Sequence, residues 1–193
     1  MRIVGGAWRG RTIEAPKGRE VSRPTTDRVR EALASVVESA LHDGIEGACV
    51  LDAFAGTGAL GLEMLSRGAA HASFFDIDRR AAALVRRNLA SLGCDSSRFQ
   101  VCCGDSISFA RRGRMPGSPF DVVLIDPPYA LGTVPAEELL ASLDRGGLLS
   151  NGAVVLFERV QSTPALSVSR FENLREKRYG QTCIDVLRYT PGD

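Results

Sequence analysis

The chain has 193 residues, of which 44% are hydrophobic and 24% are charged, and its net charge is +1. This length and apolar content suffice for the core of one domain, which excludes an intrinsically disordered chain. No apolar run approaches the roughly 18 residues of a membrane span, and the start "MRIVGGAWRG" lacks the apolar core of a signal peptide. We therefore expect a cytoplasmic protein with no membrane partner.

The five cysteines give no sign of a disulfide framework or a metal site. Their number is odd, and they show neither CxxC spacing nor a neighbouring histidine pair. We expect reduced cysteines that serve in packing, and no bound metal. The residues concerned are Cys49, Cys94, Cys102, Cys103 and Cys183.

The small net charge conceals an uneven distribution. Residues 1–30 hold eight Arg or Lys and three acids, a net charge of +5, whereas the remainder holds 16 basic and 20 acidic groups, a net charge of −4. Concentrated positive charge favours a polyanionic partner, because neutralising phosphates releases their counterions. A solvated basic surface is the alternative interpretation of the same pattern.

The first forty residues predict a hairpin followed by a helix. The segment "RIVGGAWRGRTIE" has two short strand-like pieces around glycines, and we expect a basic hairpin extension over 1–22 ahead of a main domain over 23–193. Removal of residues 1–15 is then expected to spare the fold. Apolar side chains recur at helical spacing from Val29 to Leu41, with Thr25 or Thr26 available as the N-cap.

From residue 48 onward, strand-like and helical patterns alternate. Apolar runs at 48–54, 72–77, 99–103, 120–126 and 152–158 are separated by helical stretches such as 80–93 and 136–146. Such alternation predicts a parallel sheet with right-handed crossovers. The segments 168–180 and 181–190 predict a closing hairpin, which adds one antiparallel strand. Seven such strands predict the α/β, Rossmann-like class I fold of S-adenosylmethionine-dependent methyltransferases.

The end of the first strand carries a glycine-rich loop. In "VLDAFAGTGALGLE", Gly56, Gly58 and Gly61 match G-x-G-x-x-G between a strand and a helix. Glycines there allow a sharp turn and a close approach of ligand to the free amides of the helix start. The motif also serves dinucleotides, so it does not choose between NAD and S-adenosylmethionine.

Two further strand ends carry acids. Asp76 follows the second strand, where a carboxylate can accept both hydroxyls of a ribose, whereas Asp78 is expected to cap the next helix. Asp105 follows the third strand, where it either accepts from an adenine amino group or caps a helix.

The fourth strand ends in "DPPY", which suits methylation of an amino group conjugated to an aromatic ring. The lone pair of such an amine is delocalised, so the nitrogen is a poor nucleophile. If the Asp126 carboxylate and the Pro127 carbonyl accept its two N–H bonds, they orient it and stabilise the charge that develops. Pro128 helps to hold that carbonyl in place, and Tyr129 can stack on the base.

Together these segments resemble the bacterial RsmD-type methyltransferases, which modify guanine N2 in 16S ribosomal RNA. The resemblance rests on "RIVGGAWRGR", "RPTTDRVRE", "DAFAGTGALGLEMLSRGA", "DPPY" and "REKRYGQT", and so covers nearly the whole chain. It implies S-adenosylmethionine as cofactor and 16S rRNA as partner. We expect the protein to be a monomer that binds this rRNA within an assembling small subunit. Asp76, where glutamate is more usual, and Thr57, where serine is usual, are departures.

The predicted site residues fall into three sets. The catalytic set is Asp126, Pro127, Pro128 and Tyr129. The cofactor-binding set is Asp52, Phe54, Gly56, Thr57, Gly58, Asp76, Ile77, Asp105 and Ser106. The RNA-binding set is Arg2, Trp8, Arg9, Arg11, Arg23 and Arg28. Trp8 has a packing role as its alternative, and Arg23 and Arg28 can face either the cofactor carboxylate or RNA.

Other functions remain open at this stage. Another amino-methyltransferase, such as a DNA adenine-N6 enzyme, could use the same "DPPY" corner. An NAD-dependent oxidoreductase would bind the same glycine loop, and a non-catalytic RNA-binding protein would keep the basic head. Comparing the affinities for NADH and for S-adenosylmethionine distinguishes an oxidoreductase from a methyltransferase. The intact "DPPY" argues against a catalytically silent protein.

Overall fold

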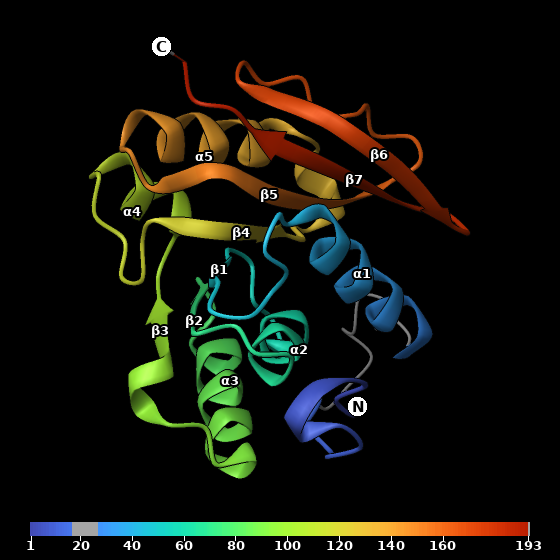
Figure 1. Ribbon diagram of the computed structural model, residues 1–193, viewed down its shortest axis with the longest axis vertical. Coiled ribbons are helices and arrows are strands. Elements are labelled where there is room, and N and C mark those ends of the chain that lie inside the picture. The colour runs from blue at the N-terminus through green and yellow to red at the C-terminus, as the bar shows by residue number, and fades with distance from the viewer. Residues whose placement is uncertain (17–26, 193) are drawn as a thin grey trace.

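A central seven-stranded sheet organises the molecule (Figure 1). The computed structural model describes residues 1–16 and 27–192. The sheet order is β3-β2-β1-β4-β5-β7-β6, and β7 alone runs antiparallel to its neighbours β5 and β6. The predicted strand arrangement is thereby confirmed. The strands are β1 Cys49–Asp52, β2 His71–Asp76, β3 Phe99–Cys103, β4 Phe120–Ile125, β5 Leu149–Val160, β6 Phe171–Tyr179 and β7 Thr182–Tyr189.

Helices cover both faces of the sheet. The first face carries α1 Asp27–Ala40, α2 Ala59–Ser66 and α3 Arg79–Leu92, and the second carries α4 Ser106–Arg111 and α5 Val134–Arg145. Short 3-10 turns span Gly6–Trp8, Ser96–Arg98 and Tyr129–Leu131. No helix within the described ranges is long and apolar enough to cross a membrane.

Two apolar cores result from the alternation of side chains along each strand. On β5, Val154 and Leu156 join the core under α1, α2 and α3, while Val155 and Phe157 join the core under α5. A strand buried on both faces therefore reads as an unbroken apolar run, which is why β4 and the middle of β5 could be recognised in the sequence.

The first sixteen residues form a hairpin-like arm that belongs to the main core. Its two limbs pair through an Arg2–Thr12 bridge and through the Ile3 N–H, which donates to the Arg11 carbonyl at 2.9 Å. Ile3 and Ile13 are 0% and 1% exposed. The expectation that residues 1–15 can be removed without harm is therefore wrong, because their loss would uncover the core beneath α1 and α2.

Hydrogen bonds fasten the tip of this arm to α2. The Val4 N–H donates to the Glu63 carboxylate at 2.9 Å, and the Trp8 N–H donates to Ser66 Oγ at 2.9 Å. Ser66 in turn donates to the Gly5 carbonyl at 2.6 Å. The tip thus sits at the C-terminal end of α2, which is the amino-end side of the sheet.

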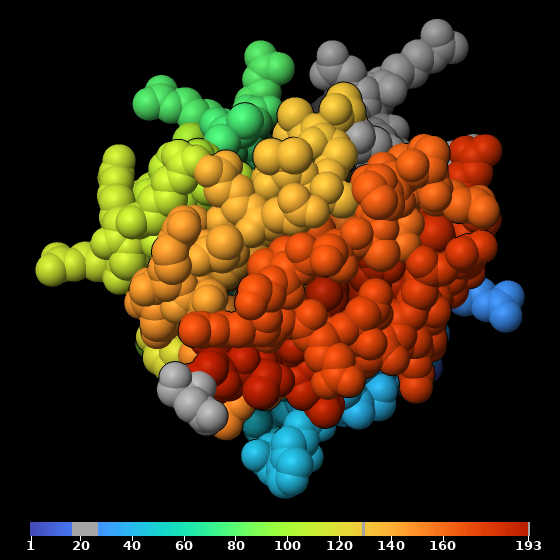
Figure 2. Space-filling model, turned by 90° about the horizontal axis from the view of Figure 1, so that it is seen from above, coloured from blue at the N-terminus to red at the C-terminus, as the bar shows by residue number. Residues whose placement is uncertain are grey.

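The closing hairpin of β6 and β7 covers one end of the molecule beside α5 (Figure 2). Arg159 on β5 is 5% exposed and pairs with Asp185 on β7, with 2.7 Å between Nε and Oδ2. Its Nη2 also reaches Glu176 on β6 at 2.6 Å. This buried ion pair holds the three strands together. Removal of one partner would leave the other charge buried without compensation, which lowers the stability of the fold.

Candidate active site

The strand order reverses between β1 and β4, and the candidate site lies at their carboxyl ends. β1 pairs with β2 on one side and β4 on the other, so successive crossovers leave in opposite directions. Ligands of open α/β sheets bind at such a switch point. The Ala53 N–H donates to the Leu124 carbonyl at 3.0 Å. The glycine loop after β1 and the "DPPY" corner after β4 are therefore neighbours.

The glycine loop has the backbone that its sequence predicts. Gly56 and Gly58 have φ angles of +51° and +74°, a region that other residues rarely adopt. A Cβ at Gly61 would lie 2.4 Å from the Phe74 ring and 2.9 Å from Asp52 Oδ2. Because the Gly61 N–H donates to that carboxylate at 3.2 Å, α2 can start directly against the strands.

Asp76 braces the loop from the neighbouring strand. Its carboxylate accepts the Gly56 N–H and the Asp78 N–H, each at 2.8 Å, and remains half-buried at the rim. The next side chain, Ile77, is 77% exposed although it is large and apolar. An exposed apolar side chain beside a fixed carboxylate suits the face of a base attached to a ribose.

Asp105 and Ser106 start α4 at the third strand end. The Asp105 carboxylate accepts from the Ile107 and Ser108 amides at 3.1 and 3.3 Å, which is a helix cap. Of the two roles left open by the sequence, the cap is observed. Ser106 Oγ is buried and has no hydrogen-bond partner among the residues that the structure describes.

Phe54 and Thr57 support the loop from within. Phe54 is half-buried and packs against the core on the α4 and α5 side. Thr57 Oγ1 accepts the Ala59 N–H at 3.3 Å at the start of α2. Their observed contacts are therefore with the protein itself.

At the "DPPY" corner, Pro127 is buried, whereas Asp126 and Pro128 reach the surface. The side chain of Tyr129 lies outside the described part of the structure. The pKa of Asp126 is raised well above the usual range of a carboxyl, first by the protein packed around the carboxyl and then by the charges of Glu158 and Asp52. Contact with solvent moderates this increase but does not reverse its direction.

Four acids share one face of the sheet at its carboxyl end. Asp76 and Asp52 end β2 and β1, Asp126 follows β4, and Glu158 lies within β5 next to the end of β4. Burial raises the pKa of Asp52 to about 7, and the negative charge of Asp76 adds to this increase. The hydrogen bond from the Gly61 N–H lowers the pKa but only partly offsets the burial. Like charges so close together favour a cationic ligand, which would stabilise their ionised forms.

The predicted RNA-binding residues are not gathered at this end. Arg2 pairs with Asp27 at 2.8 Å, and Arg11 donates to the Leu92 carbonyl at 2.7 Å at the end of α3. Trp8 is half-buried against the core, which favours the packing role, while Arg9 and Arg28 are exposed. Arg23 lies outside the described residues.

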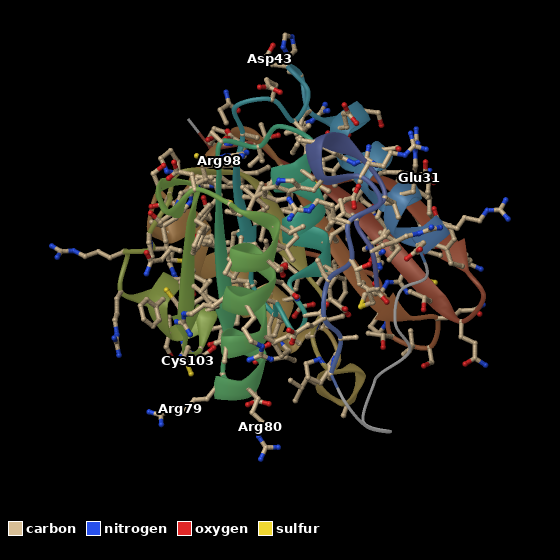
Figure 3. All side chains as sticks on the ribbon, turned by 90° about the horizontal axis from the view of Figure 1, so that it is seen from below. Glu31, Asp43, Arg79, Arg80, Arg98 and Cys103 are labelled. Carbon is tan, nitrogen blue, oxygen red and sulfur yellow. The ribbon has the colours of Figure 1, made fainter. Side chains whose placement is uncertain are left out.

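Two exposed arginines that the sequence analysis did not single out do lie at this end. Arg79 and Arg80 open α3, and Figure 3 shows them with Cys103 at one end of the molecule, opposite Arg98 and Asp43. Positive charges in a first turn oppose the helix dipole, so helix stability does not account for them. In the sequence, the two arginines directly after "FFDID" could have indicated these exposed cations. Glu158 was the other residue missed.

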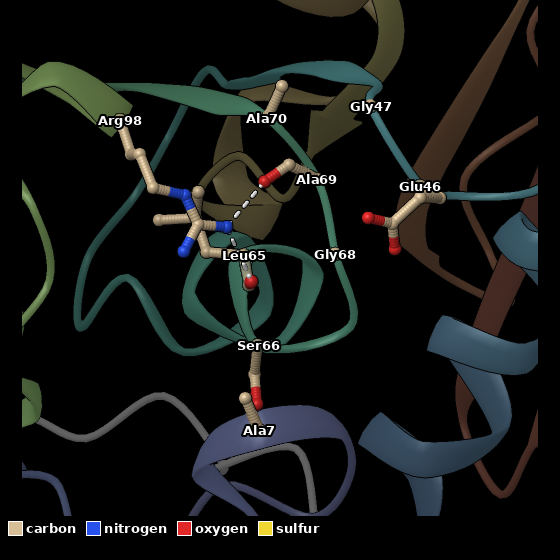
Figure 4. A pocket seen from close by; sticks show the side chains of 9 residues that line it. All are labelled: Ala7, Glu46, Gly47, Leu65, Ser66, Gly68, Ala69, Ala70 and Arg98. Carbon is tan, nitrogen blue, oxygen red and sulfur yellow. Dashed lines mark hydrogen bonds between the residues drawn. The ribbon is translucent and has the colours of Figure 1, made fainter.

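One hollow lies away from this chemistry. It measures about 410 Å³ and opens at the amino ends of β1 and β2, between Glu46 and Arg98 (Figure 4). Arg98 donates to the Leu65 and Ala69 carbonyls at 3.1 and 2.7 Å, and so caps the end of α2. We assign no chemistry to this hollow, because its one cation serves the backbone. Across residues 1–16 and 27–192, no cluster of His, Cys, Asp and Glu suits a metal ion.

Comparisons with known proteins agree with this geometry. The family model described as conserved hypothetical protein 95 matches residues 1–188. The ribosomal RNA small subunit methyltransferase D of Escherichia coli K12 is 37% identical over 189 residues, which is 97% of this chain and 89% of that protein. The protein of the same name from Haemophilus influenzae is 34% identical over 181 residues, 93% and 89% of the two chains.

Solved structures show the same architecture. An Escherichia coli structure described as a methyltransferase has a TM-score of 0.81 and 34% identity, covering 100% of this chain and 99% of that one. A Haemophilus influenzae structure described as a methylase has a TM-score of 0.77 and 29% identity, covering 98% of each chain. The chain therefore belongs to the family described as conserved hypothetical protein 95, a family of methyltransferases.

Proposed function

We propose that this protein uses S-adenosylmethionine to methylate the exocyclic N2 amino group of a guanine in small-subunit (16S) ribosomal RNA. The observation that carries the proposal is the placement of "DPPY" beside the glycine loop at the switch point of the sheet. The names of the relatives support the RNA substrate, since two of them are called small subunit rRNA methyltransferases. The protein acts as a monomer in the cytoplasm, and its substrate is an assembling small subunit.

The residues around the loop fit the proposed cofactor. A Cβ at Gly56 would meet no atom within 4 Å, so its backbone is open to a ligand on that side. Asp76 would hold the ribose hydroxyls, Ile77 would cover the adenine, and Asp105 and Ser106 would border it. When bound, the cofactor supplies a methyl group on a positively charged sulfur. The acids Asp52 and Asp126 stand where such a charge is favoured.

The "DPPY" corner would activate the target amine. The Asp126 carboxylate and the Pro127 carbonyl accept one N–H each, which turns the nitrogen lone pair toward the methyl group and stabilises positive charge as the N–C bond forms. Burial of Pro127 fixes that carbonyl. The ionised form of Asp126 is the stronger acceptor and the one that stabilises positive charge, so a cation nearby that lowers its raised pKa assists the reaction. Tyr129 is expected to stack on the base.

RNA is held in this proposal by exposed cations. Arg79 and Arg80 lie at the carboxyl end of the sheet, where α3 begins, and Arg9 on the arm and Arg28 on α1 are further exposed cations elsewhere on the surface. Arg2 and Arg11 contribute less, because their guanidinium groups already bind Asp27 and the end of α3. Phosphate contacts of this kind set affinity and position rather than base identity.

The decisive experiment is transfer of labelled methyl groups from S-adenosylmethionine to total RNA, DNA and immature small subunits, followed by nucleoside analysis and mapping of the modified position. The proposal requires N2-methylguanosine in small-subunit rRNA. Methylated adenine in DNA would instead support the alternative function, a DNA adenine-N6 methyltransferase. Calorimetry with NADH and S-adenosylmethionine tests the oxidoreductase, which requires NADH to bind more tightly.

A further inference from the structure

Glu158 is a buried carboxylate beside the catalytic corner. The last paired residues of β4 and β5 are Ile125 and Phe157, so Asp126 and Glu158 take the next equivalent positions on adjacent strands. Glu158 is 8% exposed. Adjacent strands lie about 4.8 Å apart, so two such positions are direct neighbours.

The alternation of side chains turns both acids toward the same face. Leu124 and Leu156, two residues earlier on each strand, are paired and belong to the core beneath α1, α2 and α3. Side chains two residues apart point to the same side of a strand. Glu158 therefore faces the side on which Asp52 meets the glycine loop, whereas Arg159 turns away to Asp185.

Glu158 is also a neighbour of Pro127, the residue whose carbonyl would accept from the target amine, because both border one small hollow that is too narrow to admit a water molecule. The walls of this small hollow include Pro127, Glu158, Gly132 and Thr163. The charge of Glu158 contributes to the raised pKa of Asp126, which is a second sign that the two carboxyls are close. Hence a base with its amino group at Asp126 and Pro127 would present its neighbouring ring atom to Glu158.

We propose that Glu158 accepts a hydrogen bond from N1–H of the target guanine and so determines which base is methylated. The inference rests on the proposed function. Guanine carries N1–H directly beside its N2 amino group, so one flat edge offers three donors to Asp126, Pro127 and Glu158. In adenine the ring nitrogen beside the exocyclic amine is an acceptor, which a carboxylate repels. Glu158 thus selects guanine and rejects adenine.

The test compares guanine with 2-aminopurine, which keeps the 2-amino group but has an acceptor at N1. Each base is placed at the mapped position of the RNA, and single-turnover methyl transfer is measured for wild type and Glu158→Gln. The control is Glu172→Gln, an exposed position on the edge strand β6. The ratio of the two rates, compared between the variants, cancels the intrinsic reactivity of each amine.

We expect Glu158→Gln to lower transfer to guanine by about 10- to 100-fold, because Gln loses the negative charge that strengthens this hydrogen bond and adds an amide donor that N1–H opposes. Transfer to 2-aminopurine should change by less than about 3-fold, and the Glu172→Gln control should match wild type with both bases. Equal losses for both bases, or a loss explained by weaker binding of S-adenosylmethionine, would overturn the role in base selection.

Wild type provides a second measurement that does not depend on the variant folding. It should methylate guanine at least about 10-fold faster than 2-aminopurine, and equal rates would refute the inference. If wild type methylates no guanine in RNA, the proposed function itself fails. If it methylates guanine and the base preference ignores Glu158, only the present inference fails.

Discussion

The Asp76 carboxylate accepts the Gly56 N–H at 2.8 Å, across the gap between β2 and the loop that follows β1. This contact fixes the loop before any ligand binds. It also leaves the carboxylate half-buried at the rim, where each oxygen accepts one N–H bond and keeps a further lone pair as acceptor. The same side chain can therefore position the loop and bind the ribose of a cofactor.

Asp76→Ala should weaken the binding of S-adenosylmethionine by about 2 to 4 kcal/mol, because the charge-assisted bonds to the ribose and the hydrogen bond from the Gly56 N–H are lost together. Isothermal calorimetry measures this loss. Asp78→Ala is the matched control, since Asp78 caps α3 through the Arg80 N–H and should affect stability rather than affinity. Unchanged affinity in a folded Asp76→Ala protein would refute the assignment.

Asp126→Ala should lower single-turnover methyl transfer by roughly 100-fold or more while leaving cofactor affinity nearly unchanged. The reason is that its contact matters most while charge develops on the target nitrogen. Rapid-quench measurements with saturating cofactor report the rate. A near-normal rate would require us to withdraw the mechanism.

Asp52 should make the ligand-free protein less stable as pH rises. Its folded-state pKa of about 7 lies above the unfolded value, so its contribution is fully present below pH ~4 and is lost as pH rises through 7. Asp52→Asn removes this loss. Relative to wild type, the variant should be more stable at pH 8 than at pH 5 by about 1 to 4 kcal/mol. Urea unfolding at the two pH values measures the difference, and a pH-independent difference would contradict the assignment.

Arg9 and Arg11 should separate RNA binding from folding. Arg9→Ala, at an exposed position, should reduce the slope of log RNA affinity against log salt by about one unit with little change in melting temperature. Arg11→Ala removes the bond to the Leu92 carbonyl and should cost about 1 kcal/mol of stability. Salt titrations and thermal unfolding of both variants provide the comparison. If Arg9→Ala keeps the wild-type slope, Arg9 contacts no phosphate.

Asp185→Ala should destabilise the fold by about 3 to 5 kcal/mol, because it leaves the Arg159 guanidinium buried without its bidentate partner. Chemical unfolding measures this cost. Glu172→Ala on β6 is exposed and should stay within about 0.5 kcal/mol of wild type. A small effect at Asp185 would show that Glu176 alone compensates the charge.

Local patterns in the sequence determined the strands and helices of this protein. The apolar run at 120–126 became β4 Phe120–Ile125, because a strand buried on both faces must be apolar throughout. The run at 99–103 became the edge strand β3 Phe99–Cys103, in which only Val101 is fully buried. The glycine spacing at Gly56 and Gly58 required positive φ angles, which are observed. "DPPY" fell at a strand end because two prolines cannot continue a strand.

Tertiary structure alone decided the partners of charged side chains and the depth of the arm. Arg11 resembled Arg9 in sequence, yet it binds the carbonyl that ends α3, some eighty residues away. Ile3 and Ile13 became core residues because α1 and α2 close over them. Glu158 came beside Asp126 through strand pairing across 32 positions of chain. Such contacts depend on sheet order and register, which bring together residues that no local pattern relates.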